Sequence, residues 1–212
     1  MLKAPKTEEV LIDGPAGRLE GLYERPASGE ATGVAVVCHP HPVHGGTMQN
    51  KVTHTLARAF LACGFATLRF NFRGVGESEG EFDEGAGELD DAGAATRWIR
   101  DRHREPPLWI SGFSFGAAIA IKAATTFSAA GLVSVAPAIT RVAGGSAAQP
   151  TCPWLVIQGE DDELVDAEET IAWINGLEPG PELLMFPETG HYFHGRLVRL
   201  REAVEEFVSR HS

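Results

Sequence analysis

The chain contains 212 residues, and its 43% hydrophobic content is sufficient for the core of one large domain. The formal net charge of -11 disfavours nucleic-acid binding, because phosphate contacts need clustered lysines and arginines, and we expect no nucleic-acid partner. The N-terminus lacks the apolar core of a signal peptide, and no apolar run is long enough to span a membrane. Three widely separated cysteines, Cys38, Cys63 and Cys152, are typical of reduced thiols. We therefore expect a cytoplasmic protein without a membrane partner.

The first predicted element is a β-hairpin, in which "EEVLI" and "RLEGLYERP" flank the turn "DGPAG". After the hairpin, apolar runs rich in β-branched residues alternate with helix-like segments. The predicted strands are 33–39, 65–72, 108–114, 131–137, 154–160 and 182–186, and the predicted helices are 51–63, 86–103, 115–127, 167–175 and 193–209. This alternation predicts an α/β fold, a mostly parallel twisted sheet with helices on both faces, in a single domain over 1–212.

The sequence "GFSFG" at 112–116 lies directly between a predicted strand and a predicted helix. A G-x-S-x-G pattern in that position indicates a sharp turn that presents the hydroxyl of Ser114 as a nucleophile. The turn strains the serine backbone, and glycines two residues away on either side remove Cβ atoms that would clash. The alternative is that Ser114 is an ordinary serine at a helix N-terminus.

A nucleophilic serine needs a base, and the base needs a carboxylate that orients it. The segment "WLVIQGEDDELVD" is a buried strand that runs into an acidic turn, and "ELLMFPETGHYFHG" is a further strand that leads to His191 at the start of the last predicted helix. Parallel strands direct their carboxyl ends to one edge of the sheet. We therefore expect Ser114, an acidic residue near 162 and His191 to converge.

Two further motifs, "HPHPVHGG" at 39–46 and "NFRGVGESEG" at 71–80, follow the first two strands after the hairpin. With these motifs the chain resembles the α/β-hydrolases, in particular small bacterial members that carry H-P-H-P-x-H-G-G, from about Thr7 to the C-terminus. The resemblance implies that Ser114 is the nucleophile, that His191 is the base, and that Asp162 is the acid, within the pattern G-x-x-D-x-x-V as "GEDDELV".

Three residues compete with this assignment. Asp161 and Asp166 lie in the same acidic turn as Asp162, although most aspartates in turns are simply solvated. His194 lies one helical turn beyond His191 in the last predicted helix, where an exposed imidazole is more usual.

Acyl transfer also needs donors for the negative oxygen of the tetrahedral intermediate, usually two backbone N–H groups. In hydrolases of this kind one donor is the residue after the nucleophile, here Phe115, and the other lies in the loop after the strand 33–39. His41 stands between Pro40 and Pro42, which have no N–H group, so its amide is the single donor of that tripeptide. We expect the backbone N–H groups of Phe115 and His41 to form the oxyanion hole.

A metal site is the competing interpretation of the histidine-rich stretch. His39, His41 and His44 fall at the histidine positions of the H-x-H-x-D-H motif of metallo-β-lactamases, but Val43 stands where that motif needs aspartate. We expect no metal and no other cofactor. For His39 and His44 we expect side chains that are hydrogen-bonded parts of the loop.

Only residues 138–153 are available where related hydrolases insert a cap, too few for a folded cap domain, so we expect an open site. The predicted function is hydrolysis of small or short-chain carboxylic esters, with a small-molecule acyl substrate. An acyl thioesterase is the alternative, because the same three side chains serve both leaving groups. Metal-dependent hydrolysis and a non-catalytic binding protein on the same fold are less favoured.

Overall fold

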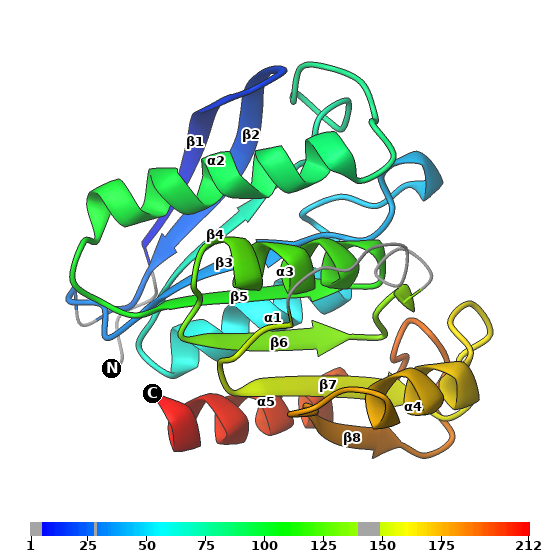
Figure 1. Ribbon diagram of the computed structural model, residues 1–212. Coiled ribbons are helices and arrows are strands. Elements are labelled where there is room, and N and C mark those ends of the chain that lie inside the picture. Colours follow the sequence, from blue (N-terminus) through cyan, green and yellow to red (C-terminus); the bar gives the residue numbers. More distant parts are fainter. Residues whose placement is uncertain (1–5, 28, 140–148) are drawn as a thin grey trace.

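The computed structural model describes residues 6–27, 29–139 and 149–212, and these residues contain one eight-stranded sheet (Figure 1). The strands are β1 Lys6–Gly14, β2 Gly17–Arg25, β3 Val34–Cys38, β4 Ala66–Phe70, β5 Leu108–Phe113, β6 Gly131–Val135, β7 Trp154–Gly159 and β8 Glu182–Phe186. Their order is β1-β2-β4-β3-β5-β6-β7-β8. All neighbouring strands from β4 to β8 pair in parallel, and β1 and β2 form the predicted antiparallel hairpin at one edge. The mostly parallel sheet expected from the sequence is therefore confirmed.

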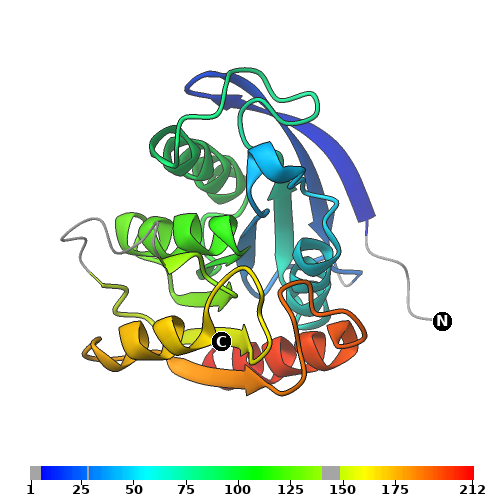
Figure 2. The same cartoon turned by 90° about the vertical axis from the view of Figure 1, so that its right-hand side faces the viewer.

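Helices cover both faces of the sheet. They are α1 Lys51–Ala62, α2 Ala86–Arg102, α3 Phe115–Thr126, α4 Ala167–Asn175 and α5 Leu197–His211. One face carries α2, α3 and α4, and the other carries α1 and α5 (Figure 2). Among the described residues, none of the helices combines the length and the apolar character needed to cross a membrane.

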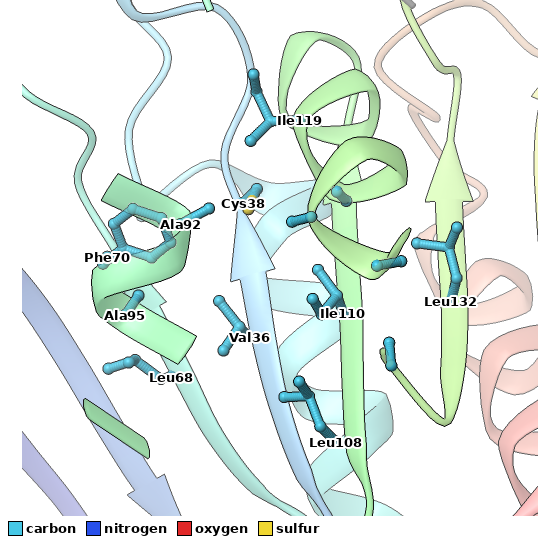
Figure 3. Packing of buried hydrophobic residues seen from close by; sticks show 14 of the residues in the cluster. Val36, Cys38, Leu68, Phe70, Ala92, Ala95, Leu108, Ile110, Ile119 and Leu132 are labelled. Carbon is cyan, nitrogen blue, oxygen red and sulfur yellow. The ribbon is translucent and has the colours of Figure 1, made fainter. Parts of the chain in front are cut away.

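Alternating residues of the central strands supply the core on each side. In β3, Val36 and Cys38 face α2 and α3, whereas Ala35 and Val37 face α1 and α5, and all four are fully buried. Figure 3 shows the first of these layers, where side chains of β3, β4 and β5 meet small residues of α2. Burial on both faces explains why these strands have nearly continuous apolar sequences.

The predicted last helix is wrong at its beginning. The sequence favoured a helix over 193–209, whereas α5 spans Leu197–His211. Phe193 and Gly195 have φ angles of 53° and 71°, in the left-handed region, and a right-handed helix cannot include them. His191 therefore lies in a loop ahead of α5, and His194 lies in the same loop rather than inside a helix.

The other predicted helices and strands have observed counterparts whose boundaries differ by no more than two residues at either end. Most of the predicted irregular stretch 138–153 lies outside the described residues, because 140–148 are not described. All parallel strands end at one edge of the sheet, on the right in Figure 1, and the loops that follow them gather there.

Candidate active site

The turn between β5 and α3 holds Ser114 in a strained conformation. Its φ and ψ angles are 56° and -118°, a region that costs a residue with a side chain on the order of 1–3 kcal/mol. A Cβ atom on Gly112 would lie 2.2 Å from the carbonyl oxygen of Gly116, and one on Gly116 would lie 2.3 Å from that of His39. Both glycines are therefore required by close backbone approaches, as the sequence predicted.

Two side chains from other loops, His191 and Asp162, form one hydrogen-bonded chain with this serine. His191 Nε2 lies 3.1 Å from Ser114 Oγ, and His191 Nδ1 lies 2.9 Å from Asp162 Oδ2. A carboxylate accepts a hydrogen bond, so Nδ1 carries the proton, and Nε2 is left to accept the hydrogen bond that the serine hydroxyl donates. The imidazole is buried, with its side chain 3% exposed, and the Phe113 ring packs on it at 4.9 Å. This is the arrangement in which an imidazole can take a proton from a serine.

The carboxylate of Asp162 is held by hydrogen bonds on several sides. Its oxygens accept the backbone N–H groups of Leu164 and Val165 at 2.9 and 2.8 Å and the side-chain amide of Gln158 at 3.1 Å. Burial raises the pKa of Asp162, but His191 and the backbone N–H groups of Val165 and Leu164 outweigh it and leave the pKa below its usual value. Asp162 is therefore ionised at neutral pH and fixed in orientation.

The three competing residues are placed differently. Asp161 is exposed, and Asp166 caps α4 by accepting the backbone N–H of Glu169 at 2.8 Å. His194 is exposed beside the ring of Tyr192, 5.9 Å between centroids. Of the three aspartates in the turn, Asp162 is the one that contacts His191.

The loop after β3 is built around a buried histidine. His39 Nδ1 lies 2.6 Å from the carbonyl oxygen of Pro40, and His39 Nε2 accepts the backbone N–H of Phe72 at 3.0 Å. Burial lowers the pKa of His39 to about 4, so the ring is neutral at physiological pH. The prediction that His39 is a hydrogen-bonded part of the loop is confirmed.

The other two histidines of this loop lie against each other. The rings of His41 and His44 are stacked with centroids 4.4 Å apart, and the ring of His41 also lies 5.0 Å from that of Phe115. The loop closes on itself through hydrogen bonds from the backbone N–H groups of His44 and Gly46 to the carbonyl oxygen of His41, at 3.2 and 3.0 Å. His41 and Phe115, the two residues expected to form the oxyanion hole, are thus neighbours beside Ser114.

The histidine cluster does not fit a metal ion. Both ring nitrogens of His39 are occupied by backbone groups, which leaves no lone pair directed to an ion. Across the part of the chain that the structure describes, no group of three or more histidine, cysteine, aspartate or glutamate side chains has the spacing to hold a metal.

Known proteins with the same architecture identify the family. A family model described as Hydrolase_4, serine aminopeptidase S33, matches residues 35–149. The chain belongs to this family of α/β serine hydrolases. The α/β-hydrolase fold predicted from the sequence is therefore confirmed.

Two solved structures are similar to this hydrolase over nearly its whole length. An α/β serine hydrolase homologue from Coxiella burnetii is 44% identical, with a TM-score of 0.89 and coverage of 94% of this chain and 96% of that chain. A protein of Xanthomonas campestris described as an α/β serine hydrolase without a lid is 40% identical, with a TM-score of 0.91 and coverage of 99% and 97%. An uncharacterised protein of Rickettsia prowazekii (strain Madrid E) is 35% identical over 210 residues, which are 94% of this chain and 88% of that protein.

The candidate active site of the hydrolase opens into a small pocket of about 110 Å³. The loops after β3, β5, β7 and β8 supply its walls, at the edge of the sheet that faces the viewer in Figure 2. The lining residues are Pro40, His41, His44, Gly45, Gly46, Asn50, Ser114, Leu164, His191 and Tyr192. Leu164 and Tyr192 are exposed apolar side chains, 62% and 44% accessible, so one wall of the pocket is apolar.

The sequence interpretation missed Glu163. Its Oε2 accepts the backbone N–H of His191 at 3.0 Å, and this hydrogen bond is the main reason that the pKa of Glu163 lies below its usual value. A Cβ atom on Gly190 would lie 2.7 Å from the same oxygen, so the glycine before His191 makes room for the carboxylate. In the sequence, a glutamate in an acidic turn looks like a solvated side chain. The one sign of a close contact is the glycine, Gly190, directly before His191.

Proposed function

We propose that this hydrolase cleaves small or short-chain carboxylic esters through an acyl-enzyme intermediate on Ser114. The observation that supports the proposal is the hydrogen-bonded chain from Ser114 through His191 to Asp162, with the serine held in its strained turn. These are the groups that nucleophilic acyl transfer needs, at hydrogen-bonding distances.

The proposed reaction has two halves. Ser114 Oγ attacks the ester carbonyl carbon while His191 Nε2 takes the hydroxyl proton, and the N–H groups of His41 and Phe115 stabilise the resulting oxyanion. The imidazolium, stabilised by the Asp162 carboxylate, then gives its proton to the leaving alkoxide as the carbon–oxygen bond breaks. In the second half a water molecule loses a proton to His191 and attacks the acyl-enzyme. The imidazolium then gives this proton to Ser114 Oγ as the bond from Oγ to the acyl carbon breaks, which releases the acid and restores the serine.

The pocket favours a compact acyl group. The pocket beside Ser114 is small, about 110 Å³, and its exposed apolar side chains are Leu164 and Tyr192, so it offers a long acyl chain little apolar surface. A long acyl chain would leave most of its surface in water. We therefore expect hydrolysis rates to fall as the acyl chain lengthens.

A thioester is the second candidate substrate. Ser114 would attack the same carbonyl carbon in an ester and in a thioester. The lining residues of the pocket include no side chain that selects an oxygen leaving group. Peptide cleavage from a free N-terminus, which the description of the family model names, is less favoured. A substrate ammonium group needs a carboxylate partner, and the lining residues of the pocket include no aspartate or glutamate.

The test is a chain-length series of matched esters and thioesters, with Ser114→Ala as control. We expect the highest kcat/KM for short esters and loss of turnover in Ser114→Ala, whereas a non-catalytic binding protein would show no turnover in either form. Chelators should leave the rate unchanged. Higher kcat/KM for thioesters at every chain length would replace the esterase proposal with the thioesterase one.

A further inference from the structure

A second cavity, of about 310 Å³, continues from the catalytic pocket along the beginning of α1. The two cavities share Gly45, Asn50 and Tyr192, so they lie next to each other. The remaining lining residues of the second cavity are Thr47, Gln49, Lys51, Val52 and His194. A substrate whose carbonyl carbon lies at Ser114 can therefore extend one end into this second cavity.

The charge of the second cavity differs from that of the protein as a whole. The chain has 29 acidic and 18 basic residues, yet the cavity is lined by two side chains that can carry a positive charge, Lys51 and His194, and by no aspartate or glutamate. On the other side of Gln49, a cavity of about 280 Å³ is lined by Glu9, Glu20 and Glu77. Lys51 and His194 thus line the cavity next to the catalytic pocket, whereas the three glutamates line the cavity on the other side of Gln49.

Helix stability does not explain why a lysine stands at this position. Lys51 is the first residue of α1, where the helix dipole favours an acidic side chain and disfavours a cation. Asn50 already caps the helix by accepting the backbone N–H groups of Val52 and Thr53 at 2.8 and 3.3 Å. By contrast, α2 and α4 carry glutamates in their first turns. A cation set against the dipole beside the catalytic pocket indicates a role in binding.

We propose that the second cavity binds an anionic group, a carboxylate or a phosphate, at the end of the substrate remote from the scissile bond, and that Lys51 determines this specificity. The inference rests on the proposed ester hydrolysis at Ser114 and names the substrate class of that site. An ammonium group at the mouth of an open cavity forms an exposed ion pair, worth about 1 kcal/mol or less. The expected preference is therefore several-fold rather than absolute.

The test compares kcat/KM for pairs of esters of which one member carries an anionic group and the other is neutral. One pair is the mono-p-nitrophenyl ester of glutaric acid and its neutral terminal amide, and the other is the acetyl ester of 2-hydroxyethyl phosphate and that of 2-methoxyethanol. We expect the wild-type enzyme to prefer the anionic member of at least one pair. The first pair carries a carboxylate on the acyl side and the second a phosphate on the alcohol side, so the pair that shows the preference identifies which of these two arrangements the cavity binds. The ratio of kcat/KM within that pair should fall about fivefold in Lys51→Met and at high salt, and should be kept in Lys51→Arg.

Lys6→Met is the matched control. Lys6 is the first residue of β1, opposite Arg25 in the register of the hairpin, and it lies at the end of the sheet remote from the site. It changes the net charge equally and should leave the ratio unchanged. Equal rates for the charged and neutral members of both pairs, or an unaltered ratio in Lys51→Met, would overturn the inference while the esterase proposal stands. Absence of Ser114-dependent hydrolysis of the neutral esters would overturn both.

Discussion

Two buried histidines lie at the carboxyl edge of the sheet, and they have opposite surroundings. His39 follows β3 and bonds backbone groups with both ring nitrogens, to Pro40 and Phe72. His191 follows β8 and bonds side chains with both, to Asp162 and Ser114. Each ring is nearly inaccessible, at 0% and 2% residue exposure, so burial alone does not separate them.

The partners of the two rings decide what each ring can do. A ring held between a carbonyl oxygen and an amide N–H has one fixed neutral tautomer, because protonation of His39 Nε2 would place two donors against each other. A ring held between a carboxylate and a hydroxyl can gain a proton, because the carboxylate stabilises the resulting charge. The comparison places His39 in the structure of the loop and supports the proton transfer that we propose for His191.

We expect the largest effect from a substitution that removes the carboxylate bound to His191. Asp162→Asn presents an amide donor where an acceptor is required, and the same change in serine proteases costs about 10⁴ in turnover, or roughly 5 kcal/mol. We expect a similar loss in kcat with the fold intact, measured by steady-state kinetics and circular dichroism. Asp161→Asn and Asp166→Asn should change kcat by less than about tenfold, since neither carboxylate contacts His191. A larger loss in Asp161→Asn than in Asp162→Asn would contradict the comparison.

The next effect concerns stability and His39. Its pKa of about 4 in the folded protein lies below the unfolded value of about 6.5, so between these pH values the unfolded chain binds a proton that the folded chain does not. Above pH 6.5 neither state is protonated and the contribution is constant. As the pH falls from 6.5 to 4, the free energy of unfolding should therefore decrease by about 3 kcal/mol from this group.

Urea unfolding of His39→Gln at a series of pH values tests this expectation. Glutamine does not titrate, so the variant should lose stability less steeply than the wild type between pH 6.5 and 4. If the free energy of unfolding changed equally steeply with pH in His39→Gln and in the wild type, His39 would be protonated in the folded state. The backbone partners of His39 would then not keep its ring neutral, and the contrast with His191 would fail.

We expect the smallest effect on kcat from a substitution that frees the backbone N–H of His191. Glu163→Ala removes the acceptor of the His191 N–H, and the imidazole should be less firmly placed against Ser114. We expect kcat to fall about five- to tenfold with little change in KM, as for a positioning residue. Glu163→Gln should restore most of the rate, because an amide oxygen still accepts the hydrogen bond. Glu188→Ala, which removes an exposed carboxylate of the loop that carries His191, is the matched control, and an equal loss there would refute a specific role for Glu163.

The sequence predicted the fold and the convergence of Ser114 and His191 because both depend on local patterns. Parallel strands end at one edge, and the two glycines around Ser114 have a steric cause visible in "GFSFG". The choice of Asp162 over Asp161 needed the spacing known from related hydrolases, since residue type does not tell which carboxylate turns inward. The structure supplies the reason, because the N–H groups of Leu164 and Val165 hold that carboxylate.

Two features were beyond the sequence. The start of α5 depends on left-handed conformations at Phe193 and Gly195, and a phenylalanine adopts that conformation only because tertiary packing buries its ring, 5.5 Å from Phe186. The contact between Glu163 and the His191 backbone joins loops that lie 28 residues apart in the chain. Neither follows from the periodicity of the sequence.

Active-site labelling tests the central claim, that Ser114 is a nucleophile activated by His191, most directly. A fluorophosphonate reacts covalently with an activated serine, and peptide mass spectrometry locates the modified residue. We predict labelling on Ser114 in the wild type, unchanged by chelators, and none in Ser114→Ala or His191→Ala. The serine mechanism would be contradicted if the enzyme hydrolysed esters while Ser114 stayed unlabelled, and if chelators abolished that hydrolysis.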